Sequence, residues 1–161
     1  MRRAFCYALR PAAAMRILTL VTGAEALPAA LRLTGEIRTF NAEIDFRLRF
    51  LHVEIEEVYV LPADLAAAAR KATSNDLVEI ATKDPLEAAA RLALALEDHR
   101  PEIVVLAGDG PLLAPGLAAA RACGRPVAFF AGAAAGDGLD LGSEPPSAVE
   151  RLTGVAREFS E

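Results

Sequence analysis

The sequence predicts a three-layer α/β domain, in which a parallel sheet is covered by helices on both faces. The chain has 161 residues, which is the size of one domain. Short apolar runs, of which Ile103–Ala107 is the clearest, alternate with longer segments of helical period. Glycine and proline separate these segments. Strands joined through helices require right-handed crossovers, and such crossovers produce a parallel sheet.

Composition excludes several classes of function. Hydrophobic residues make up 53% of the chain and charged residues 24%, so a sizeable core is available. The net charge of −5 argues against a nucleic-acid partner, which needs a cationic surface. No apolar run approaches the ~20 residues of a membrane span, so no membrane partner is expected. The two cysteines and two histidines are far apart, which leaves no metal site or disulfide framework. We expect a cytoplasmic protein without a cofactor.

The first fourteen residues differ from the rest of the chain. Residues 1–14 carry arginine but no acid and end in alanines, as a secretory signal does. The apolar centre at residues 5–9 is shorter than the apolar region of such a signal. Met15 opens a clean strand pattern. We therefore expect residues 1–14 to be a disordered or mis-called leader, and residues 15–161 to form a single domain.

The first half of this domain contains an ambiguous stretch. Residues 45–60 show strand-like alternation whose phase reverses near Leu51, which suggests two strands. Gly35 is expected to end the first helix. The expected strands are 17–21, 46–51, 57–61 and 77–80, and the expected helices are 25–33 and 62–71.

The second half has clearer signals. Asp84, Pro85 and Glu87 combine a helix N-cap, a proline at the first helical position and an acid in the first turn. We expect this helix to end near His99. Its predicted buried stripe is Leu86, Ala89, Ala90, Ala93 and Leu96. The remaining expectations are strands 103–107 and 127–131, a helix ending at Cys123, a glycine-rich loop over 132–142 and a helix over 146–159.

Three glycine-containing loops are candidates for a ligand site. In parallel α/β sheets, ligands bind beyond the carboxyl ends of the strands, where helix N-termini offer free N–H groups. The loops are 22–25, 108–110 and 132–138. The candidate ligand-binding residues are Gly23, Glu25, Gly108, Asp109, Gly110, Gly132 and Asp137. Alternatively the glycines serve only strand-to-helix turns, and Asp109 is only the N-cap of the following helix.

The motifs resemble those of the non-hydrolysing UDP-N-acetylglucosamine 2-epimerases. Residues 99–109, HRPEIVVLAGD, resemble the family segment KPDLVLVHGD, and GRPVA at 124–128 resembles GIPVA. Residues 131–137 resemble an eroded EAGLRTGD, and PPS at 145–147 with RLTG at 151–154 resembles PEE followed by NR and LTG. At the other end, MRILTLVTGAEA at 15–26 resembles MKVLTVFGTRPEA. The resemblance implies a Rossmann-like N-terminal domain of the GT-B type.

The departures from the family pattern argue against its reaction. The family's arginine has no counterpart beside Gly23, and its glutamate falls at Ala131. Its paired acids fall at Pro146 and Ser147. Only the aspartate of the GD pair is kept, as Asp109, which would be the one catalytic candidate if the chain were active. A positioned acid or base contributes ~10²–10⁴-fold, so these losses should abolish useful turnover. The family's second domain, which holds most of the UDP contacts, has no counterpart in this sequence.

Three interpretations remain open. The first is a degenerate, non-catalytic relative of the epimerase domain that binds a nucleotide sugar weakly or acts through a partner chain supplying a second domain. The second is a stand-alone nucleotide- or flavin-binding module, because residues 84–130 also resemble electron-transfer flavoprotein subunits. The third is a structural homodimer. If the chain is an enzyme, the resemblance implies an isomerase of the epimerase type.

Overall fold

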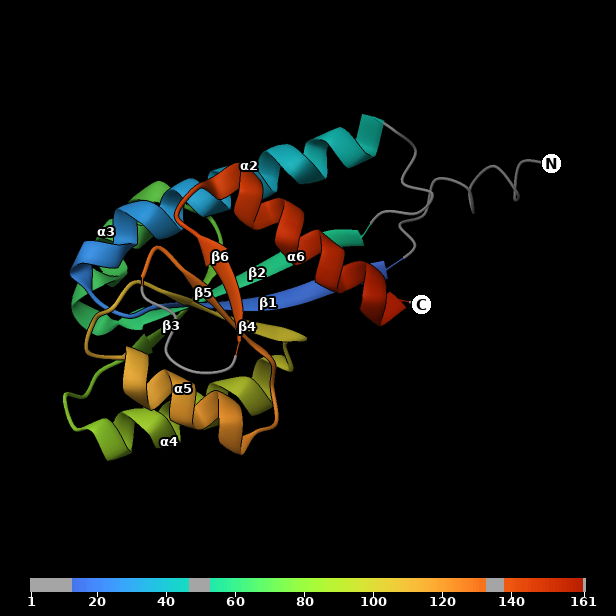
Figure 1. Cartoon of the computed structure of the whole chain (residues 1–161). Coiled ribbons are helices and arrows are strands. Elements are labelled where there is room, and N and C mark those ends of the chain that lie inside the picture. The colour runs from blue at the N-terminus through green and yellow to red at the C-terminus, as the bar shows by residue number, and fades with distance from the viewer. Residues whose placement is uncertain (1–12, 47–52, 133–137, 161) are drawn as a thin grey trace.

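The computed structural model describes residues 13–46, 53–132 and 138–160. Six parallel strands form one sheet in the order β3-β2-β1-β4-β5-β6, which confirms the predicted α/β class (Figure 1). The strands are β1 (Ala13–Val21), β2 (Val53–Pro62), β3 (Asp76–Ile80), β4 (Ile103–Ala107), β5 (Val127–Phe130) and β6 (Leu139–Gly142). The helices are η1 (Ala24–Ala26), α2 (Leu27–Phe46), η2 (Ala63–Leu65), α3 (Ala66–Ala72), α4 (Pro85–His99), α5 (Leu113–Ala122) and α6 (Pro145–Ser160).

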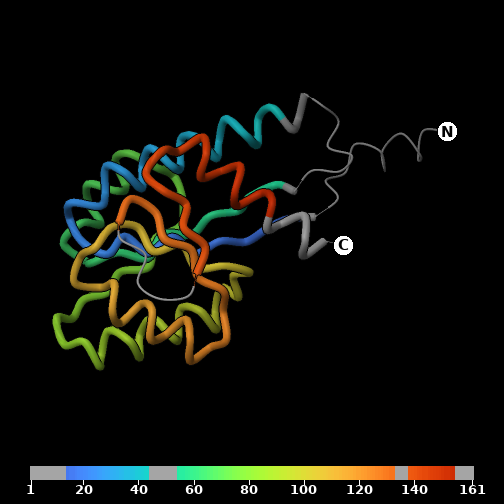
Figure 2. The backbone as a smooth tube through the Cα atoms, in the orientation of Figure 1, coloured from blue at the N-terminus to red at the C-terminus, as the bar shows by residue number. Residues whose placement is uncertain are grey.

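The helices divide into two layers. Helices α2, α3 and α6 cover one face of the sheet, and α4 and α5 cover the other (Figure 1). In the first layer α2 and α6 lie side by side, as the backbone trace also shows (Figure 2). Leu33 of α2 and Leu152 of α6 are fully buried there against Ile17 of β1. On the other face, Leu92 and Leu96 of α4 pack over the central strands. Both faces of the sheet are therefore covered by apolar side chains of the helices, as a three-layer fold requires.

The strand order places β1 and β4 at the centre of the sheet. From β1 the chain moves outward through β2 to β3, and from β4 it moves outward through β5 to β6. The loops after β1 and β4 consequently leave the sheet in opposite directions. In doubly wound folds this switch point is where ligands bind. No helix in the part of the chain that the structure describes is long and apolar enough to cross a membrane.

The predicted boundaries around the first helix were wrong. Helix α2 continues through Gly35 to Phe46, so residue 46 ends a helix and does not begin a strand. Gly35 is exposed and faces open space, and the helix continues because Ile37 and Phe40 on the following turn pack into the core. A glycine inside a helix costs only about 1 kcal/mol, which this burial outweighs. Residues 47–51 of the expected strand lie outside the described residues.

The predicted buried stripe of α4 was correct at Leu96 and wrong at its other positions. The helix begins and ends as expected, and the Leu86 N–H donates to Asp84 Oδ1 at 3.4 Å. Its buried side chains are Ala88, Leu92, Ala95 and Leu96, whereas Leu86 is 82% exposed. Alanine occurs on several sides of this helix, so apolar spacing alone does not identify the buried face.

Two further boundaries differ from the predictions. The stretch 132–142 was expected to be a loop, yet it contains the edge strand β6, in which Leu141 is fully buried. Strand β1 begins at Ala13, two residues inside the predicted leader, because Ala13 and Ala14 pair with the start of β2. The remainder of the leader, residues 1–12, lies outside the described residues.

A polar cluster lies between α2 and the sheet. The Glu57 carboxylate of β2 accepts hydrogen bonds from the Thr19 and Thr34 hydroxyls, each at 2.7 Å, and from Asn75 Nδ2 at 2.8 Å. Tyr59 is fully buried beside it, in hydrogen-bond contact with Thr34, and donates to the Ala30 carbonyl at 2.9 Å. These bonds join β1, β2, α2 and the segment before β3.

Burial raises the pKa of Glu57 above its usual range, against the lowering effect of its hydrogen bonds and the Arg38 charge. Burial and the neighbouring Glu57 charge also raise the pKa of Tyr59. A carboxyl group whose pKa is raised by folding stabilises the protein fully below its unfolded pKa. That contribution is lost as pH rises through the folded pKa.

The substitution Glu57→Gln should remove this pH dependence, because glutamine resembles the neutral acid in shape and in having one acceptor and one donor end. Relative to the variant, the wild type should lose free energy of unfolding as pH rises from about 4.5, measured by urea unfolding at a series of pH values. A parallel pH dependence in both proteins would contradict the role assigned to Glu57. Glu36→Gln, on the same layer, is the matched control.

Candidate functional site

Thr22 joins the two central strands at the switch point. It follows β1 directly, is fully buried, and donates its hydroxyl to the Ala107 carbonyl at the end of β4 at 2.7 Å. The same hydroxyl accepts the Gly110 N–H at 2.8 Å. Its backbone N–H donates to Ala107 O at 3.1 Å, and its carbonyl accepts from Leu112 N–H at 3.0 Å. Four hydrogen bonds thus connect one residue of the first half with the loop that opens the second.

Close backbone contact at the same point requires glycine. A Cβ on Gly110 would lie 2.4 Å from the Thr22 carbonyl oxygen, and one on Gly23 would lie 3.0 Å from Pro111 Cδ. Gly108 adopts φ +87°, and a Cβ there would lie 2.4 Å from Ala26 Cβ. The loops after β1 and β4 are therefore in direct contact, which closes the space between them to a ligand.

A pocket of about 740 Å³ opens beside these joined loops. It lies over the carboxyl ends of β1, β2 and β3, and its volume is within the range typical of small-molecule sites. The lining residues are Gly23, Ala24, Pro62, Ala63, Asp64, Leu65, Ile80, Ala81, Thr82, Lys83, Pro85, Ala88, Pro111, Leu112 and Pro115. Most of these side chains are apolar.

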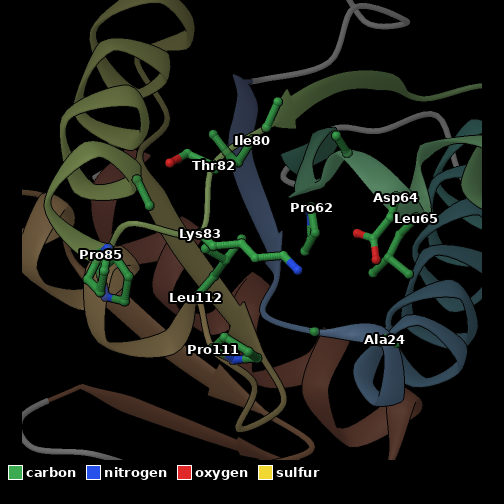
Figure 3. Close-up of a pocket in the computed structure, with 15 residues that line it drawn as sticks. Ala24, Pro62, Asp64, Leu65, Ile80, Thr82, Lys83, Pro85, Pro111 and Leu112 are labelled. Atoms are coloured by element: carbon green, nitrogen blue, oxygen red, sulfur yellow. The ribbon is translucent and has the colours of Figure 1, made fainter.

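Two side chains of opposite charge face each other across this pocket. Lys83, from the loop after β3, extends its ammonium group into the pocket, and Asp64, from η2, directs its carboxylate toward the same space (Figure 3). Both are exposed, and neither forms an ion pair with another residue that the structure describes. The pocket therefore offers one cation and one hydrogen-bond acceptor to a ligand.

Few backbone N–H groups are available around the pocket. Pro62, Pro85 and Pro111 have no N–H, and the N–H of Leu112 is bonded to Thr22. Gly23 precedes η1, which has no side-chain cap and continues directly into α2. An anion in this pocket would thus be held by Lys83 and the start of the η1–α2 run, and not by a glycine-rich cradle.

The structure separates the residues that the sequence predicted as one site. Gly23 lines the pocket, but Glu25 is exposed on η1 outside the lining. Gly108 and Gly110 support the contact between the loops, as described above. Gly132 lies beyond them at the end of β5, and Asp137 is outside the described residues.

Asp109 points away from the pocket, toward the loop after β5. A Cβ on Gly132 would lie 2.7 Å from Asp109 Oδ1, so the carboxylate rests against that glycine. The alternative prediction, that Asp109 is the N-cap of the next helix, was wrong. Helix α5 begins at Leu113, and its N-cap is Leu112, without a side-chain hydrogen bond.

Sequence reasoning missed Asp64 and Lys83 because it considered only loops that contain glycine. The rule that ligands bind at the carboxyl ends of strands applies equally to the loops after β2 and β3. Both loops follow strands that had been predicted. A polar residue beyond each of those strands was the available signal.

The groups with raised pKa lie elsewhere. Glu57 and Tyr59 belong to the α2 face, whereas the pocket is bounded by the start of α4 and α5. Strongly perturbed acids and bases are a mark of catalytic sites, so their position beneath α2 indicates a structural role. No group of histidine, cysteine or acidic side chains suited to a metal ion occurs among the described residues.

Comparisons with known proteins support the fold. No family model matches the chain, and no curated protein resembles it closely enough to count as a match. The solved structure of MurG from Acinetobacter baumannii superposes with a TM-score of 0.55 over 72% of this chain and 35% of its own, at 12% identity. A UDP-N-acetylglucosamine 2-epimerase gives a TM-score of 0.53 over 72% and 33%, at 16% identity.

The chain thus spans about a third of the length of these two structures. At such low identity the likeness concerns the fold alone. The Rossmann-like α/β fold expected from the sequence is confirmed.

Replacing Thr22 by valine should destabilise the protein by about 1–3 kcal/mol, because the half-buried Gly110 N–H would lose its acceptor while the side-chain volume is kept. The free energy of unfolding in urea measures this loss. Thr39→Val is the matched control, since the exposed Thr39 hydroxyl only bonds the Gly35 carbonyl within its helix. An equal change in the free energy of unfolding for both substitutions would show that the hydrogen bonds of Thr22 stabilise the protein no more than that of Thr39.

Proposed function

We propose that the chain is a non-catalytic, Rossmann-like domain that binds a nucleotide sugar weakly in the pocket over β1, β2 and β3. The observation that carries this proposal is the Lys83 ammonium group, which extends into a pocket of about 740 Å³ at the ligand-binding edge of the sheet. The fold of the superposed epimerase, an enzyme named for a nucleotide sugar, supports this class of ligand.

The phosphate groups of the ligand are expected to lie between Lys83 and the start of η1. An anion is favoured at the N-terminal end of a helical run, and η1 with α2 forms one such run. Lys83 reaches the same space from the opposite loop. With a single cation and few N–H donors, the pocket favours weak binding over tight binding.

The exposure of the charged side chains in the pocket to water supports a non-catalytic role. Among the described lining residues, Asp64 and Lys83 are the only charged side chains, and both are exposed. Moving a proton on a sugar carbon requires positioned acids and bases that are held away from water. Asp109, the one acid kept from the epimerase pattern, rests against Gly132, outside the pocket lining.

A thermal-shift titration with UDP-N-acetylglucosamine tests the proposal. Ligand at 100 times its Kd stabilises a protein by about 2.7 kcal/mol, which raises Tm by several degrees in a domain of this size. Lys83→Gln should weaken binding about tenfold through loss of the charged contact. Lys71→Gln, which changes the only other lysine, should leave it unchanged.

The same samples test the absence of catalysis. No epimer and no free UDP should form when the protein is incubated with the nucleotide sugar. Turnover in the ordinary range of ~1–10³ s⁻¹ would disprove the non-catalytic part of the proposal. A missing thermal shift, or an equal loss of binding in both lysine variants, would disprove the binding part.

Association with a second copy is a second candidate role, favoured by the exposed face of α4. Leu86 is 82% exposed and Leu94, two turns later, is 60% exposed. They are the large apolar side chains that the described surface leaves exposed. Exposed apolar residues grouped on one helix are typical of an interface.

If α4 forms a dimer, light scattering should give twice the mass of the chain at high concentration, and Leu86→Glu with Leu94→Glu should return it to the monomer mass. A standard interface buries roughly 1,200–2,000 Å². A monomer at all concentrations would rule out the dimer without affecting the ligand proposal.

A further inference from the structure

We propose that Asp64 accepts hydrogen bonds from the two hydroxyl groups of a ribose, so that the pocket selects ribonucleotides over 2′-deoxyribonucleotides. This inference rests on the proposed function, because it concerns the same pocket, and it states which part of the ligand lies where. The nucleoside occupies the pocket with its ribose at Asp64, and the phosphate lies at Lys83.

The position of Asp64 in the fold is the first argument. Pro62 is the last residue of β2, and Asp64 follows it in η2, at the carboxyl end of the strand next to β1. In doubly wound sheets, a carboxylate beyond the first strands of the sheet binds ribose hydroxyls, while phosphate lies at the loop after the first strand. Gly23 and Ala24, at the loop after β1, line the same pocket.

The bonding state of Asp64 is the second argument. Exposed acids of the described surface differ in their partners: Glu79 pairs with Arg70 at 2.5 Å and Glu87 with Arg91 at 2.7 Å. Asp64 forms no hydrogen bond or ion pair with a described residue, and its carboxylate points into the pocket (Figure 3). An ionised carboxylate only accepts hydrogen bonds, and its two oxygens match the two donors of a vicinal diol.

The opposite charges exclude a purely anionic ligand. Asp64 would repel a phosphate placed at its side of the pocket, so the phosphate is directed to Lys83 on the facing wall. A ligand with hydroxyl donors at one end and an anion at the other satisfies both groups. A nucleotide has this arrangement.

The apolar walls suit the remaining part of such a ligand. Pro111 and Leu112 on one side, and Pro62 and Leu65 on the other, offer apolar surface to a flat heterocycle (Figure 3). Thr82 is the only uncharged polar side chain of the lining apart from backbone groups. The pocket is therefore expected to recognise the ribose and the phosphate by polar contacts and to discriminate little between bases.

Isothermal titration calorimetry with uridine 5′-monophosphate and 2′-deoxyuridine 5′-monophosphate tests this inference. The wild type should bind the ribonucleotide about tenfold more tightly, the effect of one hydrogen bond to a charged group. In Asp64→Ala both nucleotides should bind with equal, weaker affinity. Asp64→Asn should retain part of the preference, because its amide oxygen still accepts one bond. Asp98→Asn, an exposed acid near the far end of α4, is the matched control and should behave as the wild type.

The outcomes separate this inference from the proposed function. Equal affinity of the wild type for both nucleotides, or a preference that persists in Asp64→Ala, overturns the ribose assignment while leaving nucleotide binding intact. Failure of the wild type to bind uridine 5′-monophosphate, 2′-deoxyuridine 5′-monophosphate and UDP-N-acetylglucosamine overturns both. The Tm of each variant is measured alongside, and because Asp64 is exposed, it should match the wild type.

Discussion

The fold depends on the contact that Thr22 makes between the two halves of the sheet. Strand β1 begins the half that extends to β3, and β4 begins the half that extends to β6. Helices α2 and α6 pack against each other across the two halves, and at the ligand-binding edge the β1–β4 ladder and the Thr22 side chain connect the halves directly. A buried hydroxyl with both a donor and an acceptor partner is costly to replace, since an apolar substitute would leave the Gly110 N–H without a partner.

This contact also decides where a ligand can lie. In an open doubly wound sheet the crevice at the switch point is free, and phosphate lies in it. Here Gly110 and Gly23 bring the two backbones together, which fills the crevice with protein. The open space is displaced toward β2 and β3, under Pro62 and Lys83. The glycines of these loops therefore have a structural role in packing. The charged side chains that reach the pocket come instead from the loops after β2 and β3, which contain no glycine.

The sequence predicted the fold class well, because that prediction rests on the alternation of strand-like and helical segments and on the glycine and proline residues between them. Both signals depend on neighbouring residues in the chain. Asp84 and Pro85 start α4 as expected, since an N-cap and a proline act through their own backbone. The buried face of α4 could not be predicted. Alanine leaves several faces equally apolar, and contact with the sheet at Leu92 selected one of them. The continuation of α2 through Gly35 likewise depends on the burial of Ile37, which lies beyond the local signal.

The candidate site was predictable as an edge of the sheet but not as a set of residues. Gly23 was found because it follows the first strand, whereas Asp64 and Lys83 come from loops whose meeting depends on strand order. That order places β3 beside β2, so the loops after these strands face each other across the pocket only once the sheet is assembled.

The buried carboxyl group of Glu57 and the exposed charges of the pocket lie in different parts of the molecule, which agrees with the proposed binding role. Glu57 is held under α2 by Thr19, Thr34 and Asn75, where its hydrogen bonds tie the helix to the sheet. Burial there raises its pKa, which in another setting would suit a catalytic acid. Glu57 does not line the pocket, so it has no direct contact with a ligand bound there. The polar groups that do reach the pocket, on Asp64 and Lys83, are solvated and of opposite sign. Such groups are suited to orienting a ligand by hydrogen bonding and charge, which is the role proposed for this pocket.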